Sequence, residues 1–236
     1  MNILDFAILL FLVLGALVGW YHGLVRAGAN ALAVLLAMVL ALCFCGGMAR
    51  RVEKKGKLIP QLLNYSETDA LIADVDLART PVEGLDAPAL NELMADVRLP
   101  YPVDQRFREN VARGTFLARG IVSVNDTLAM TITHLSVNIG CFEVLFVILL
   151  AALLVAVHGL DVVLQFPILR HGDGPAGALV GIFGAVFLLI ALAAVIPVGL
   201  SYVPFEEITA IVDKSAACAF FYRSNFILQL MKGFIA

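Results

Sequence analysis

Four long apolar runs divide the sequence, and each is long enough to form a membrane-spanning helix. A helix needs about 20 mostly apolar residues to cross a hydrocarbon core about 30 Å thick. The runs cover residues 3–21, 27–48, 139–158 and 176–197. Short polar breaks separate the first run from the second and the third from the fourth. The pattern predicts an all-α membrane bundle of four transmembrane helices, arranged as two hairpins in residues 1–49 and 139–200.

A polar insertion of residues 50–138 separates the two hairpins and holds most of the charged residues of the chain. We expect it to be mostly helical. Asp86-Ala-Pro88 followed by Ala-Leu-Asn-Glu-Leu-Met94 predicts a short helix, with Asp86 as its N-cap. The stretch 103–117 predicts a second, amphipathic helix. Its expected apolar positions are Val103, Phe107, Val111 and Phe116.

Two further segments favour the membrane surface. Residues 121–136 are apolar with Thr and Asn interspersed, which indicates an interfacial or re-entrant helix leading into the third run; a fifth, weak span is the alternative. The tail, residues 201–236, alternates apolar and polar positions with scattered basic residues. This alternation is typical of an amphipathic helix lying on a bilayer.

The composition supports a membrane protein and excludes several other classes. Hydrophobic residues make up 61% of the 236 residues, charged residues only 15%, and the mean hydropathy is +0.94. Soluble domains are roughly 45–50% apolar and about 25% charged, so a soluble enzyme of this length could not bury the excess. Disorder requires the opposite composition. A net charge of −3, without a basic face, also excludes a nucleic-acid partner.

Basic residues indicate an orientation. Five of them crowd the end of the second run: Arg50, Arg51, Lys54, Lys55 and Lys57. Because Lys and Arg near span ends favour the cytoplasmic side, the long insertion and both termini are expected in the cytoplasm.

Small residues recur every fourth position in the apolar runs. They are Gly15, Gly19 and Gly23 in the first; Ala29, Ala33, Ala37 and Ala41 in the second; Gly177, Gly181 and Ala185 in the fourth. This spacing places them on one helix face, where backbones can approach closely. The stripes predict tight packing within one chain, in preference to a homo-oligomer contact, which stays the alternative.

Ionisable residues at membrane depth are candidates for function, because a charge in hydrocarbon is costly. Glu143, about one turn inside the third run, is the candidate proton or cation site. Pairing with a polar group on a neighbouring helix, or a place at headgroup level, is the competing interpretation. Asp5, His158 and Asp161 are near enough to span ends to be interfacial.

The sequence contains no familiar catalytic or metal-binding pattern. A phosphate loop, a zinc-protease helix and a nucleophile elbow are all missing. The four cysteines, Cys43, Cys45, Cys141 and Cys218, lack metal-type spacing and are expected to be small buried hydrophobes. We therefore expect no enzyme, no catalytic residues, no cofactor and no metal.

Two motifs resemble the colicin V production protein (CvpA) family. The opening Ile3-Leu-Asp5-Phe-Ala-Ile8, its apolar run and the following Gly23-Leu-Val-Arg26 resemble the start of that family. Asp173-Gly-Pro-Ala-Gly177-Ala-Leu-Val-Gly181 is similar to the family's Asp followed by two glycines four residues apart. The resemblance covers about half of the chain, residues 1–50 and 139–200.

The resemblance implies a multi-pass protein of the bacterial inner membrane. It would support toxin or bacteriocin production or export and envelope homeostasis without catalysing a reaction, by assembling with other membrane or secretion components in the lipid bilayer. Asp5, Arg26, Asp173 and the glycines would position its helices. If the Arg26 turn marks the cytoplasmic side, as the family's basic turn would suggest, the insertion faces outward instead. A small ion- or proton-coupled transporter or channel using Glu143 is the alternative function.

Overall fold

The computed structural model describes residues 2–65, 71–72, 74–85, 87–95, 97, 99–163, 173–202 and 206–235. The regular structure in these ranges is helical, and β-type pairing there is limited to a bridge between Pro81 and Ser123. The expected all-α class is therefore confirmed. The chain divides into two compact units. The first comprises Met1–Cys45, Phe142–Ala194 and Ile211–Ile227, and the second comprises Gly46–Cys141, Val195–Ala210 and Leu228–Ala236.

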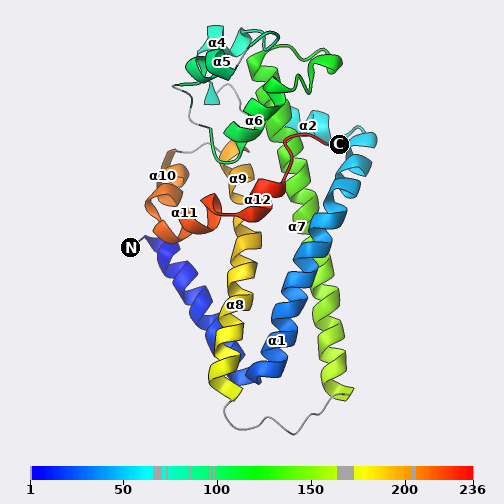
Figure 1. Cartoon of the computed structure of the whole chain (residues 1–236), viewed down its shortest axis with the longest axis vertical. Coiled ribbons are helices and arrows are strands. Elements are labelled where there is room, and N and C mark those ends of the chain that lie inside the picture. The colour runs from blue at the N-terminus through cyan, green and yellow to red at the C-terminus, as the bar shows by residue number, and fades with distance from the viewer. Residues whose placement is uncertain are drawn as a thin grey trace. The chain divides into compact units, whose positions relative to one another are not determined.

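Three helical stretches are long and apolar enough to cross a membrane: Ile3–Lys54, Val124–Gly159 and Asp173–Tyr202. The first is α1, which changes direction at Gly23, where φ is 76° and ψ 173°. Figure 1 shows α1 as two arms, one on each side of this reversal. The second stretch belongs to α7 (Val124–Val163), and the third contains α8 (Asp173–Ala193) and α9 (Ile196–Tyr202). Pro197 lies in the first turn of α9, where its missing N–H breaks no helical bond.

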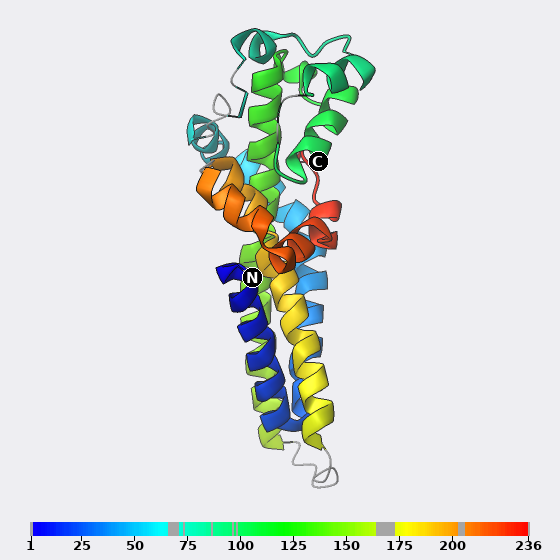
Figure 2. The same cartoon turned by 90° about the vertical axis from the view of Figure 1, so that its left-hand side faces the viewer.

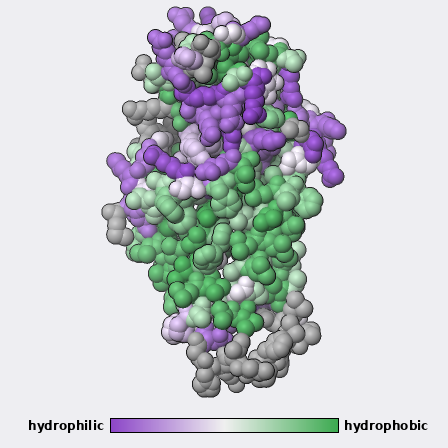
Figure 3. Space-filling view, in the orientation of Figure 1, coloured by the Kyte–Doolittle hydropathy of each residue, from purple (hydrophilic) through white to green (hydrophobic). Residues whose placement is uncertain are grey.

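The first unit consists of the two arms of α1, the later part of α7, α8 and the short α11 (Ala216–Arg223). The first arm of α1 and α8 run side by side (Figure 2). Large apolar side chains cover the visible outer surface of α1 and α8 (Figure 3). Val155, Leu179 and Phe183 are 73%, 70% and 61% exposed. An apolar surface this extensive is suited to lipid rather than water.

The second unit surrounds the first part of α7 with short helices. They are α2 (Leu58–Tyr65), α4 (Val75–Arg79), α5 (Ala87–Leu93), α6 (Val103–Ala112) and the 3₁₀ turn η1 (Leu117–Arg119). Phe107 of α6 and Leu128 and Ile132 of α7 are almost fully buried. The unit thus has its own apolar core.

Both predicted helices of the insertion are present. The helix to Met94 is α5, while its expected cap, Asp86, lies outside the described residues. The second is α6, in which Val103, Phe107 and Val111 are buried as expected. It ends at Ala112 rather than at residue 117, because Gly114 takes a positive φ of 58°. Phe116 is buried in the turn that follows.

Two sequence predictions were wrong. Most of residues 121–136 form a helix that leads into the third run, as expected, but they are neither re-entrant nor a separate span, because α7 begins at Val124 and runs on through them without a break. Ser123 starts the helix by accepting the Asp126 N–H (3.1 Å) and donating to the Asp126 carboxylate (2.7 Å).

The tail is not one amphipathic helix but three short ones, α10 (Glu206–Lys214), α11 and α12 (Phe226–Leu230). Ser215 and Asn225 interrupt the tail. Each accepts a backbone N–H of the following helix through its side chain, at 3.1 Å and 3.0 Å respectively.

Candidate functional site

Small residues of the first arm of α1 and of α8 meet in one contact, which we call the glycine seam. Its members are Gly15, Gly19, Gly23, Gly177, Gly181 and Ala185. A Cβ added at Gly19 would lie 2.9 Å from the carbonyl carbon of Gly177 and 2.9 Å from the Cα of Gly181. A Cβ at Gly177 would lie 2.8 Å from the carbonyl carbon of Gly23. The first arm of α1 and α8 therefore touch backbone to backbone, as small-residue spacing allows.

The turn at Gly23 closes one end of the seam. Its φ of 76° belongs to the left-handed region that glycine adopts readily. The Asp173 carboxylate, at the start of α8, lies over this glycine, 3.1 Å from where a Cβ would be. Asp173 is also in the first turn of α8, where a negative charge interacts favourably with the helix dipole. Three residues carrying the family resemblance, Gly23, Asp173 and Gly177, thus come together from two distant segments.

Asp5 has a structural role that its position near a span end did not indicate. Its carboxylate accepts a hydrogen bond from the Ser215 hydroxyl at 2.7 Å and from the Ala217 N–H at 3.0 Å. The other oxygen accepts the Asn2 N–H at 2.9 Å. The Asn2 side chain in turn donates to the Ile211 carbonyl at 2.6 Å. Asp5 therefore caps the N-terminus of α11 and fixes the start of α1 to the tail.

An apolar cavity of about 310 Å³ lies beside the seam, between both arms of α1, α7 and α8. Two polar residues line it, His22 and Asn30; every other lining residue is apolar. The Nδ1 atom of His22 and the Oδ1 atom of Asn30 are shielded from solvent, and neither has a hydrogen-bond partner among the described residues.

Glu143 does not line this cavity, although it lies in the same unit. Its Oε1 atom is shielded and has no hydrogen-bond partner within the described ranges. The side chain of His158 bonds the Leu154 carbonyl at 2.9 Å, one turn earlier in α7. The side chain of Asp161 lies outside the described residues. The structure therefore does not gather the ionisable residues of the apolar runs around Glu143.

Cysteines and carboxylates form no metal site in the described part of the chain. All four cysteines are free thiols, of which Cys43 is exposed and the other three are buried. The expected burial thus holds for three of them. Burial raises the pKa of the Cys218 thiol, and the nearby Asp5 carboxylate raises it further. The Asp74 carboxylate caps α4 by accepting the Asp76 and Leu77 N–H groups, at 2.9 Å and 3.3 Å.

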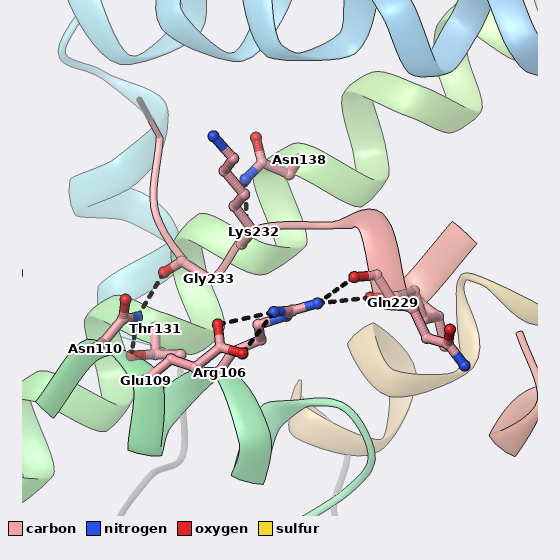
Figure 4. Close-up of polar contacts among 9 residues, drawn as sticks. Arg106, Glu109, Asn110, Thr131, Asn138, Gln229, Lys232 and Gly233 are labelled. Atoms are coloured by element: carbon pink, nitrogen blue, oxygen red, sulfur yellow. Dashed lines mark hydrogen bonds and ion pairs between the residues drawn. The ribbon is translucent and has the colours of Figure 1, made fainter. Parts of the chain in front are cut away.

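The second unit contains a polar cluster that the sequence did not single out. Its members hold the C-terminal segment, residues 228–235, against α6 and α7 (Figure 4). Asn110 donates to the Gly233 carbonyl at 2.9 Å and to the Thr131 hydroxyl at 3.0 Å. Asn138 donates to the Lys232 carbonyl at 2.8 Å. We call this arrangement the polar clamp.

Arg106 and His134 complete the polar clamp. Arg106 is only 8% exposed, pairs with Glu109 at 2.8 Å and donates to the carbonyls of Leu228 and Gln229. His134 is fully buried, and its Nδ1 accepts the Ile235 N–H at 3.3 Å. A buried guanidinium is tolerated because a carboxylate and carbonyls surround it. The arginine and asparagine side chains of the clamp donate hydrogen bonds to carbonyls at the end of α12 and in the residues after it, which have no partner within a helix.

No protein-family model, curated protein or solved structure matches this chain. What the described residues can do chemically therefore follows from three features: a seam of close backbone contact, an apolar cavity with two polar groups, and a clamp that holds a peptide segment. The seam holds two helices together, and the clamp holds a segment of the same chain.

Proposed function

We propose that this chain is a non-enzymatic inner-membrane protein of bacteria, similar to the colicin V production family. It would support toxin or bacteriocin production or export and envelope homeostasis by assembling with other membrane components. Its two α1 arms, α7 and α8 would make four crossings. The observation that carries the proposal is the glycine seam, because residues of both resembling motifs, Gly23, Asp173, Gly177 and Gly181, meet there.

The seam supports an assembly role for a physical reason. Lipid supplies little hydrophobic force between helices, so close backbone packing must hold them together. A first unit held this way presents a large apolar outer surface, on which lipid or other membrane proteins can pack (Figure 3).

The proposed role in toxin export and envelope homeostasis is tested in a toxin-secreting bacterium that lacks the gene for this protein. Secreted toxin and leakage of a periplasmic enzyme are measured after complementation. Wild type and Gly28→Ala are expected to restore both, because a Cβ at Gly28 meets nothing within 4 Å. Gly19→Ala, which breaks the seam, is expected to restore neither at matched membrane levels. Normal secretion and an intact envelope in the deletion strain would refute the proposal.

The four crossings and their orientation have a separate test. Single cysteines at Gln61 and Tyr21, both exposed, are introduced into a cysteine-free background and probed in intact cells with an impermeant thiol reagent. With cytoplasmic termini, the cysteine at Tyr21 labels directly and the cysteine at Gln61 labels only after lysis. The reverse result would place the insertion outside, and labelling of both would contradict the hairpin.

A second candidate function, an ion- or proton-coupled transporter or channel, is favoured by one observation. The Oε1 atom of Glu143 is shielded and has no partner among the described residues, which is costly unless an ion or proton is bound there. Ion flux by the purified protein in liposomes, lost in Glu143→Gln but kept in Glu92→Gln, would support it. Flux equal to that of empty vesicles, with folded protein, would exclude it.

A further inference from the structure

We propose that the cavity beside the glycine seam binds one hydrocarbon chain of a single-chain membrane lipid whose head carries a hydroxyl group. The cavity belongs entirely to the first unit and is walled by Val18 and Val34 of the two α1 arms, Leu154 of α7 and Leu188 of α8. This binding site is distinct from the assembly role proposed above, which rests on the seam.

The size of the cavity fits one chain. Its volume is about 310 Å³. A dry apolar cavity of about 150 Å³ holds benzene, so twice that volume takes on the order of a dozen carbon atoms. The lining residues on the first arm extend from Phe11 to His22, and eleven residues of helix span about 16 Å. That length is close to half of a hydrocarbon core about 30 Å thick, the depth that one leaflet's chains fill.

The polarity of the cavity is uneven along this length. His22 directly precedes Gly23 and Asn30 follows it by seven residues, so both polar lining residues lie within about 10 Å of the turn along their arms. The lining farther along both arms, at Phe11, Leu14 and Val34, is apolar. An amphiphile has the same division, with its head at the membrane boundary and its chain inside.

The polar atoms indicate the chemistry of the head. Asn30 Oδ1 is an acceptor, shielded from solvent and without a partner among the described residues. An apolar ligand would leave it unpaired, which is unfavourable. A hydroxyl can donate to Asn30 Oδ1. A further hydroxyl of the same head can accept from, or donate to, Nδ1 of His22, according to the imidazole tautomer. A hydroxyl-bearing head therefore supplies the donor that Asn30 lacks, whereas an alkane supplies none.

The test uses the full-length protein in phosphatidylcholine nanodiscs and a photoreactive monoacylglycerol with a chain of about twelve carbons. Crosslinked peptides are mapped by mass spectrometry. Labelling is expected to saturate, to map to the α1, α7 and α8 lining, and to be displaced by unlabelled monoacylglycerol. An alkane of equal length is expected to compete about tenfold more weakly, the loss expected for one unpaired buried acceptor.

Two variants separate shape from head recognition. Leu154→Trp fills the cavity from a lining position, and Val155→Trp is its matched control, because Val155 is 73% exposed and does not line the cavity. Only Leu154→Trp is expected to lose labelling, by tenfold or more. Asn30→Leu is expected to keep labelling but lose the preference for monoacylglycerol over alkane.

Labelling that does not saturate, or equal competition by the alkane in the wild type, would overturn the proposal. Because these two results need no substitution, the proposal stays testable even if Leu154→Trp does not fold. Retained discrimination in Asn30→Leu would refute the assigned head contact.

Discussion

Replacement of Gly19 by alanine tests the glycine seam most directly. The new methyl group would lie 2.9 Å from the Gly177 carbonyl carbon and 2.9 Å from the Gly181 Cα, and closer still to the Gly177 carbonyl oxygen. All of these atoms are helix backbone, which cannot turn aside as the end of a long side chain can. The first arm of α1 and α8 must therefore separate along the seam.

Comparison with a matched control, Gly28→Ala, isolates how much the clash at Gly19 lowers the free energy of unfolding. Overpacking a close contact costs about 1–3 kcal/mol. At Gly28, on the other arm of α1, an added Cβ meets nothing within 4 Å. Both substitutions gain the same higher helix propensity of alanine, about 1 kcal/mol, so this term cancels between them. Gly19→Ala should thus be less stable than Gly28→Ala by about 1–3 kcal/mol, or about 5- to 150-fold in the unfolding equilibrium.

The assay is titration of the purified protein in mixed micelles with sodium dodecyl sulfate, followed by far-ultraviolet circular dichroism. Trp20 is the chain's single tryptophan and gives a second, local signal. Its ring lies beside Gly174, 3.0 Å from where a Cβ on that glycine would be. Its fluorescence should therefore report separation of α1 from α8. Equal midpoints for Gly19→Ala and Gly28→Ala would show that the backbones do not touch, and would refute the seam.

Three further outcomes are expected. Gly15→Ala places a methyl 2.7 Å from the Ala185 Cβ and should lower the stability of the protein in the same titration. Adding Ala185→Gly should restore part of that stability, and no recovery would contradict the contact between Gly15 and Ala185. Gly233→Ala places a methyl 2.7 Å from the Arg106 Cβ and should cost about 1–3 kcal/mol, with faster amide exchange in the C-terminal segment; unchanged exchange would contradict the clamp. Because burial raises the pKa of Cys218, the folded protein holds less Cys218 thiolate at pH 8 than the unfolded protein does. Alkylation of Cys218 at pH 8 should therefore be slower before unfolding than after it, and should accelerate as the pH rises. Equal rates in the folded and unfolded protein would contradict the raised pKa.

Local patterns in the sequence predicted the features that depend on neighbouring residues. Four-residue spacing placed Gly15 and Gly19 on one face, and their face is indeed packed within the chain. Apolar residues recurring every four positions located α6, whose Val103 and Phe107 are buried. These signals work because helical periodicity alone decides which residues share a face.

Features that depend on distant contacts could not be predicted in the same way. Asp5 bonds to Ser215, 210 residues away, and nothing near Asp5 identifies that partner. The sequence pattern predicted α7 as two segments, because the polar Thr and Asn residues of 121–136 were interpreted as facing a membrane surface. In the structure they face protein: Thr131 and Asn138 are buried and bonded within the second unit.

One sequence signal for the clamp was available. Thr131, His134 and Asn138 are spaced by three and four residues, which gives α7 a single polar face. Arg106 and Asn110 have the same spacing on α6. On the otherwise apolar α7 such a polar face indicates buried polar groups with partners, since such groups are rarely left unsatisfied, whereas the pair on α6 does not stand out in a mostly polar helix. The signal predicts that a partner exists but not that it is the segment at residues 228–235.

The two units are stabilised by different interactions, and this difference predicts which substitutions each tolerates. The seam depends on the absence of atoms, so the first unit should be sensitive to added volume, as at Gly181. The clamp depends on donors for backbone carbonyls, so Asn138→Leu, of similar volume, should loosen the C-terminal segment because the Lys232 carbonyl loses its partner. Asn138→Gln can restore a donor only if the longer side chain fits. Amide exchange in residues 228–235 of both variants would separate these effects, and equal protection in wild type and Asn138→Leu would show that the segment is held by its apolar contacts instead.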